Sequence, residues 1–153
     1  MPDLQFTATI AGAPEKIFAT IADFTEYGRW LARSMSFGAT TDVTPLPVQL
    51  GTTYLDAGRA GARRGTVTEF EPPKHIAFDQ PMRGIGSGTI GIRIRYTLEP
   101  VGESTRVVRD VHLDFRIGPI GRMLEPLIVP IFRRENDRVL RALKRYIESD
   151  AAS

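Results

Sequence analysis

Residues 118–149 read GPIGRMLEPLIVPIFRRENDRVLRALKRYIES and form the only long segment of the chain with helical periodicity. At about 100° per residue, one broad face of this segment collects its apolar side chains: Leu124, Leu127, Ile128, Ile131, Phe132, Val139, Leu140, Leu143, Tyr146 and Ile147. The opposite face is rich in arginine. A helix of about 28 residues is roughly 40 Å long. It needs a sheet to cover its apolar face.

Two prolines interrupt the first part of this predicted helix. Pro126 and Pro130 each lack a backbone N–H donor, and each crowds the carbonyl four residues earlier. We therefore expect a kink or a break between Leu124 and Ile131. Two interpretations remain open, namely a mobile mouth of a binding cavity and a fixed bend that follows the curvature of the sheet.

The rest of the chain supplies the strands. Alternating apolar and polar residues predict strands at 4–10, 36–40, 52–58, 63–70, 74–80, 89–99 and 105–117. Short, turn-like connections between the last five indicate antiparallel pairing. Two short helices are expected after the first strand, at 15–22 and 24–30, and Pro45 and Pro47 predict an irregular segment over 41–51. The fold class is therefore α+β, with a curved antiparallel sheet of about seven strands wrapped round the long C-terminal helix.

The composition excludes several classes of function. The chain has 153 residues and a formal net charge of +2, which is too small an excess to indicate nucleic-acid binding. Cysteine is absent, so there is no disulfide, thiolate nucleophile or zinc–thiolate site. No apolar run approaches the ~18 residues of a membrane span, and the N-terminus lacks the pattern of a secretory signal.

We expect one domain over residues 1–150, a frayed tail at 151–153, a cytoplasmic location, and a monomer or homodimer.

Several short motifs carry a family resemblance. They are APEKIF at 13–18, DFTEYGRW at 23–30, GTTY at 51–54, GTVTEFEPP at 65–73, and the GPIGR and LRALK segments of the final helix. With the order of elements, they resemble the START-like helix-grip superfamily, also called SRPBCC, and in particular its polyketide cyclase/dehydrase-like branch. The resemblance covers nearly the whole chain. It implies a helix-grip fold and a cavity for a hydrophobic ligand, an architecture shared by carriers, receptors and cyclases.

The expected cavity lies between the sheet and the long helix, because the concave face of such a sheet is wider than one helix can fill. We expect an apolar and aromatic lining made of Trp30, Tyr54, Phe78, Ile92, Tyr96, Val111, Phe132, Val139 and Leu143. Polar contacts to the ligand are expected from Arg109, Glu135 and Asn136. Burial of apolar surface would drive binding, at about 25 cal/mol per Å².

Three polar residues lie at positions where the strand alternation and the helical periodicity predict buried apolar side chains. Arg109 shares its strand face with Val107 and Val111, so its charge must be paired, meet an anion of the ligand, or reach water at the strand end. Glu135 and Asn136 lie inside the apolar face of the long helix. They could contact Arg109 or the ligand, or stand at the margin of that face.

A second polar group occupies alternate positions of the last strand. Asp110, His112 and Asp114 share one face, where His112 could act as a general base or help to bind a metal ion. The apolar residues of this strand have the opposite parity. The sequence therefore favours a solvated outer face for the three, unless a β-bulge reverses the assignment.

No cofactor or metal site is predicted. The segment GSGTIG at 86–91 has the spacing of a dinucleotide motif, but an alternating strand follows it where that motif requires a helix. The favoured function is binding of a small lipid-like, aromatic or polyketide-like molecule, as a carrier or sensor. The alternatives are a polyketide cyclase or dehydratase that uses Glu135, Arg109 or His112, and an interaction domain with a closed cavity.

Overall fold

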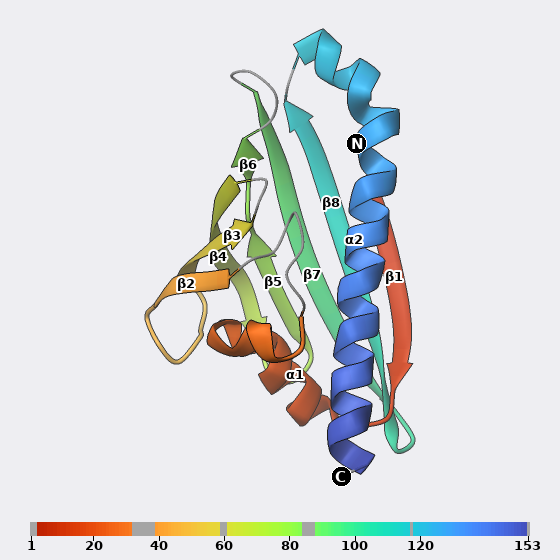
Figure 1. The fold of residues 1–153 in the computed structure, drawn as a ribbon. Coiled ribbons are helices and arrows are strands. Elements are labelled where there is room, and N and C mark those ends of the chain that lie inside the picture. The colour runs from red at the N-terminus through yellow and green to blue at the C-terminus, as the bar shows by residue number, and fades with distance from the viewer. Residues whose placement is uncertain (1–2, 32–38, 59–60, 84–87, 117, 153) are drawn as a thin grey trace.

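A computed structural model describes residues 3–31, 39–58, 61–83, 88–116 and 118–152 (Figure 1). It contains an antiparallel sheet, a short α-helix, a 3-10 helix and a long C-terminal helix. In chain order the elements are β1 (Asp3–Ile10), α1 (Pro14–Ala22), η1 (Phe24–Arg29), β2 (Ala39–Thr44), β3 (Thr53–Gly58), β4 (Gly61–Glu71), β5 (His75–Asp79), β6 (Met82–Arg83), β7 (Thr89–Val101), β8 (Ser104–Arg116) and α2 (Gly118–Ala152). The predicted α+β helix-grip class is confirmed.

Within the described residues the sheet has eight strands, and every pairing among them is antiparallel. Its order is β1-β8-β7-β5-β4-β3-β2, and the short β6 pairs with β7 off this path. In Figure 1, α2 runs along the β1 and β8 side of the sheet, and α1 lies near the C-terminal end of α2. The sheet bends away from α2 towards β2, which is the curvature that a helix-grip fold requires.

One face of the sheet and one face of α2 form the core. Every second residue is buried from Ile90 to Leu98 on β7 and from Thr105 to Leu113 on β8, as the alternation predicts. From α2, Leu140, Leu143 and Ile147 pack into the same cluster. The core-facing side of β8 also carries Arg109, which is buried although it is charged.

The C-terminal half of α2 is also tied to β1 by hydrogen bonds. Lys144 Nζ donates to the carbonyl of Thr9 at 2.6 Å, and the backbone N–H of Ala11 donates to Glu148 Oε2 at 3.0 Å. This backbone hydrogen bond, with a second from Lys144, lowers the pKa of the Glu148 carboxyl below its usual value. Together with the buried side chains, these contacts fix this half of the helix against the sheet.

The N-terminal half of α2 agrees with the prediction in its bend and differs from it in its packing (Figure 1). The helix is unbroken through Pro126 and Pro130, and its axis changes direction in its first turns (Figure 1). Leu127 and Ile131 were expected to pack on the sheet, but both are exposed. A helical wheel shows which side chains share a face, but it cannot show how far along the helix the sheet continues.

Other boundaries also differ. β2 extends to Thr44 through a register irregularity after Thr41, and Asp42 adopts a positive φ of 53°. Residues 36–38 of the strand predicted at 36–40 lie outside the described part, and Ala39 and Thr40 belong to β2. β6 was not predicted, because two residues are too few to show an alternation. The second short helix is a 3-10 helix, and α2 continues to Ala152, beyond the helical segment predicted over 118–149.

The glycine-rich motif at 86–91 lies partly outside the described residues, since 84–87 are not described. The described part begins β7 at Thr89, so a strand follows the motif, as predicted. None of the described helices has the length and apolar character needed to cross a membrane.

Candidate functional site

A cavity of about 80 Å³ lies between the sheet and α2. Its walls come from η1 and the residues after it, from β3, β5, β7 and β8, and from the middle of α2. They are formed by Tyr27, Leu31, Asp56, Phe78, Gln80, Ile92, Ile94, Arg109, Phe132, Glu135, Asn136 and Val139. The cavity is smaller than the roughly 300–1,000 Å³ typical of sites for drug-sized ligands. In this conformation it holds only a small group.

Seven of the twelve residues predicted from the sequence line this cavity. They are Phe78, Ile92, Arg109, Phe132, Glu135, Asn136 and Val139. The other five lie outside the lining. Tyr54, Tyr96, Val111 and Leu143 are buried in the core beside it, and Trp30 is half-buried against Tyr27.

The sequence did not single out five of the lining residues. The alternation of the strands could have identified three of them, namely Ile94, Asp56 and Gln80. Each lies two residues after a predicted lining residue, so its side chain is expected on the same side of the sheet. Tyr27 and Leu31 had none, since the 3-10 helix and the residues after it have no apolar periodicity that assigns side chains to a cavity.

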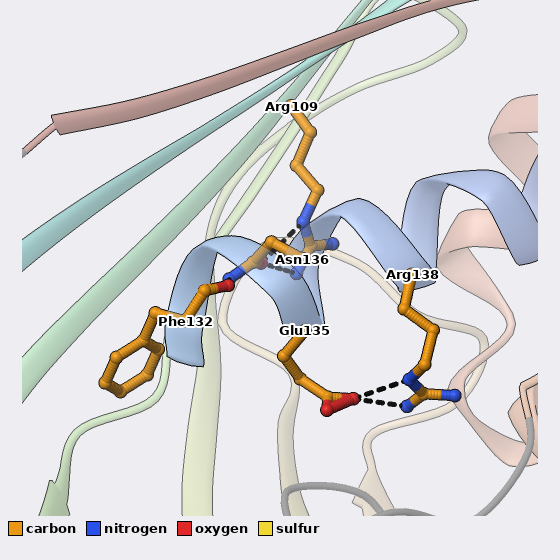
Figure 2. A network of polar contacts seen from close by, with 5 residues as sticks. All are labelled: Arg109, Phe132, Glu135, Asn136 and Arg138. Atoms are coloured by element: carbon orange, nitrogen blue, oxygen red, sulfur yellow. Dashed lines mark hydrogen bonds and ion pairs between the residues drawn. The ribbon is translucent and has the colours of Figure 1, made fainter. Parts of the chain in front are cut away.

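The central contact of the site joins β8 to α2. Arg109 Nε and Nη2 both donate to Asn136 Oδ1, at 2.9 Å and 2.6 Å, and Arg109 Nη1 donates to the hydroxyl of Tyr96 (Figure 2). Tyr96 is the register partner of Arg109 on β7, and the guanidinium also lies 5.1 Å from the centre of its ring. Both Arg109 and Asn136 are only 6% exposed.

The hydrogen bonds around Asn136 also fix the orientation of its amide. Its Nδ2 donates to the carbonyl of Phe132, one turn earlier in α2, at 2.7 Å. A flipped amide would point N–H groups at the guanidinium and an oxygen at a carbonyl, so only the observed orientation satisfies both partners. Asn136 therefore presents an uncharged acceptor to Arg109.

Glu135 does not contact Arg109. Its Oε1 accepts from Arg138 Nε at 2.7 Å and forms an ion pair with Arg138 Nη2 at 2.5 Å. Figure 2 shows the Glu135 side chain pointing to Arg138 and away from the Arg109–Asn136 pair. Of the two adjacent polar residues in the apolar face of the helix, only Asn136 binds the arginine.

A second polar group lies on the side of the cavity formed by η1 and β3. The hydroxyl of Tyr54 donates to Gln80 Oε1 at 2.8 Å, and the hydroxyl of Tyr27 donates to the carbonyl of Ile21. Burial raises the pKa of Tyr27 well above its usual value, and the neighbouring Tyr96 and Tyr54 raise it further. Tyr27 is therefore a neutral phenol at physiological pH. Asp56 contributes a carboxylate to the same wall.

Gly65 on β4 makes room for the ring of Tyr54, its register partner on β3. A Cβ at Gly65 would lie 2.1 Å from Tyr54 Cζ, so Gly65→Ala should displace the ring and break its hydrogen bond to Gln80. We expect this variant to lower the free energy of unfolding by about 1–3 kcal/mol. Urea denaturation would measure the loss. The double variant with Tyr54→Phe should lose little more, and full additivity of the two effects would contradict this coupling.

Asp110, His112 and Asp114 of the last strand lie outside this cavity. His112 is exposed and pairs with Asp3 of β1 through Nδ1, at 2.5 Å, while Asp110 accepts from Gln5 at 2.9 Å. Asp114 pairs with Arg116 at 2.8 Å. His112 therefore occupies the face of the sheet opposite α2, which is the placement that the strand parity favours.

In the described part of the chain, one group of side chains has the spacing to approach a metal ion. Potential ligand atoms of Glu69, Glu71 and His75 lie within 4.8 Å of one another at the β4–β5 turn. The Glu69 carboxylate already pairs with Arg95 at 3.2 Å, and Glu71 is exposed. Glu69 therefore already has an ion-pair partner, and we assign no metal to the group.

Comparison with solved structures shows the same architecture in several proteins. TTHA0849 from Thermus thermophilus is 17% identical, with a TM-score of 0.73 and coverage of 99% of this chain and 100% of that chain. A START superfamily protein from Mycobacterium smegmatis is 16% identical, with a TM-score of 0.69 and coverage of 96% and 97%. The di-domain ARO/CYC StfQ from the steffimycin biosynthetic pathway is 11% identical, with a TM-score of 0.73, and the match covers 99% of this chain and 52% of that one.

These identities establish the fold alone. No protein of curated function matches the sequence. The family assignment comes from residues 1–148, which match the family described as polyketide cyclase / dehydrase and lipid transport. The resemblance predicted from the sequence is thus confirmed, and the chain belongs to this family.

Proposed function

We propose that the protein binds a small, largely apolar molecule between the sheet and α2, as a carrier or sensor. The observation that carries this proposal is the cavity itself, which has walls of Phe78, Ile92, Ile94 and Phe132 and a hydrogen-bonded polar group at Arg109. An apolar enclosure with a few convergent polar groups is the usual form of a small-molecule site. The family, whose description includes both cyclases and lipid transport, fits such a cavity.

The arrangement of polar residues supports binding better than catalysis. A cyclase or dehydratase needs an acid or base within reach of the ligand. Glu135 is engaged by Arg138, Arg109 by Asn136 and Tyr96, and His112 lies on the opposite face of the sheet. The three catalytic candidates from the sequence therefore do not form an acid–base pair.

The route of entry follows from the exposed part of α2. Met123, Leu127 and Ile131 are exposed one helical turn apart, and Glu135, one turn further, lines the cavity. This apolar row therefore leads to the cavity wall. We propose that a ligand larger than 80 Å³ enters beside Glu135, where part of the ligand can remain along the exposed apolar row.

Native mass spectrometry of the purified protein, followed by extraction under denaturing conditions, tests the proposal. We expect an adduct of small-molecule mass that is lost on denaturation, or, for ligand-free protein, enhanced fluorescence of a hydrophobic dye. A clean mass without any dye response would contradict an open cavity and favour an interaction domain. The cytoplasmic location and the monomeric or homodimeric state remain predictions from the sequence.

Filling the cavity should abolish this binding. Val139 lines it from α2, so Val139→Trp should place an indole in the space and remove the dye response or the adduct. The matched control is Arg141→Trp, because Arg141 lies on the same helix with a side chain that is 74% exposed. Dye titration of both variants, with circular dichroism to verify folding, measures the effect. Equal binding by folded Val139→Trp would place the ligand elsewhere.

A further inference from the structure

The buried charge of Arg109 indicates what kind of ligand the cavity takes, provided that the proposed function is correct. Arginine remains protonated in proteins, and an isolated buried charge is costly unless it is paired. Among the described residues, no carboxylate forms an ion pair with Arg109, and its partners are an amide and a phenol. Its hydrogen bonds are therefore partly satisfied, whereas its charge is not.

The guanidinium of Arg109 has more N–H donors than its hydrogen bonds use. It carries five N–H groups, and its three hydrogen bonds use one on Nε, one on Nη1 and one on Nη2. Each terminal nitrogen thus keeps one N–H without a protein acceptor among the described residues. Charged N–H donors of this kind form their strongest hydrogen bonds with carboxylate oxygens. Arg109 lines the cavity, so an acceptor within it could reach them.

The identity of residue 136 supports this interpretation. Asn136 Oδ1 accepts from both Nε and Nη2, which is a position that an aspartate oxygen could occupy equally well. Aspartate would provide the same hydrogen bonds and neutralise the guanidinium. Asparagine holds the guanidinium in place and leaves its charge available.

The two carboxylates in the lining restrict where an anion can sit. Glu135 is paired with Arg138, and Asp56 belongs to the wall formed by β3. An anion near Asp56 would meet repulsion, whereas one at Arg109 would meet attraction. The polar part of the ligand should therefore lie against β8 and α2.

We propose that the ligand is an apolar carboxylic acid, bound as its carboxylate by the free N–H groups of Arg109. The apolar body packs against Phe78, Ile92, Ile94 and Phe132. In the conformation described, the 80 Å³ cavity holds the carboxylate and little more, so longer ligands extend towards the exposed apolar row of α2. Arg109 selects the charge of the ligand, and the walls select its apolar character.

Isosteric pairs of acid and amide test this proposal without any variant. Benzoate and benzamide provide a small rigid pair, and octanoate and octanamide provide a long flexible pair. Calorimetric titration at pH 7 should show each acid binding at least about tenfold more tightly than its amide, because a charge-assisted hydrogen bond is roughly twice as strong as a neutral one. The preference should decrease as salt is added.

Three variants test whether Arg109 causes the preference for the acid over the amide. Asn136→Asp should remove it, because the new carboxylate neutralises Arg109 while keeping both hydrogen bonds. Arg109→Gln should also remove it. The matched control is Arg106→Gln, because Arg106 lies on the same strand, is exposed, and pairs only with exposed Glu99 among the described residues. This control should retain the preference of the native protein.

The possible outcomes separate the two proposals. Equal binding of acid and amide by the native protein would overturn the carboxylate assignment and leave the binding function intact. A preference that survives in Asn136→Asp and in folded Arg109→Gln would overturn the role of Arg109. Failure of all four probes, together with no dye response, would overturn the binding function and the carboxylate assignment with it.

Discussion

Replacing Leu143 with alanine is expected to lower the free energy of unfolding by about 3–5 kcal/mol. The Leu143 side chain is 0% exposed and belongs to the cluster that joins α2 to the sheet. The expected loss combines the transfer of the missing methyl and methine groups with the cost of the void they leave, because a close-packed interior relaxes only in part. Urea denaturation followed by circular dichroism measures it.

Leu127→Ala is the matched control on the same helix. Leu127 is 68% exposed, so its truncation should change the free energy of unfolding by less than about 0.5 kcal/mol. The pair therefore tests whether the two halves of α2 contribute unequally to stability. Similar losses for the two variants would show that the N-terminal half of α2 packs against protein, and the entry route beside Glu135 would then have to be abandoned.

The sequence predicted the fold well because its two periodicities are strong. The alternation from Thr89 to Leu113 gives the buried face of β7 and β8, and the apolar face near Leu143 gives the contact with the sheet. Periodicity does not predict how far along α2 the contact with the sheet continues. Leu127 and Leu143 occupy the same predicted apolar face, and only the path of the curved sheet decides that one is exposed and the other buried.

Two residues of the candidate site were predictable because they are polar at positions where the sequence pattern predicts apolar side chains. Arg109 and Asn136 stand at apolar positions, and the structure brings them together across the β8–α2 interface. Partner choice between adjacent residues was not predictable. Glu135 and Asn136 differ by one position on the helix, and only the direction of each side chain determines that Glu135 pairs with Arg138 and Asn136 with Arg109.

The contribution of Asn136 to stability is the second large effect that we expect. Asn136→Ala removes the acceptor for two hydrogen bonds from Arg109 and leaves those donors buried beside an apolar methyl group. When a buried charged group loses a hydrogen-bond partner, its desolvation is no longer compensated. We therefore expect the free energy of unfolding to fall by about 3 kcal/mol. Urea denaturation at pH 7 measures the loss, with the free energies extrapolated to water.

Asn136→Asp separates the hydrogen bonds from the charge. It keeps both acceptor contacts with Arg109 and adds a counter-charge, but it loses the donation from Nδ2 to the Phe132 carbonyl. We therefore expect it to be more stable than Asn136→Ala. An aspartate variant as unstable as the alanine variant would mean that the hydrogen bonds to Arg109 contribute little. If the aspartate variant is at least as stable as the native protein, asparagine is not required for folding at this position. Its neutrality would then serve the ligand, because only an uncharged partner leaves Arg109 free to bind an anion.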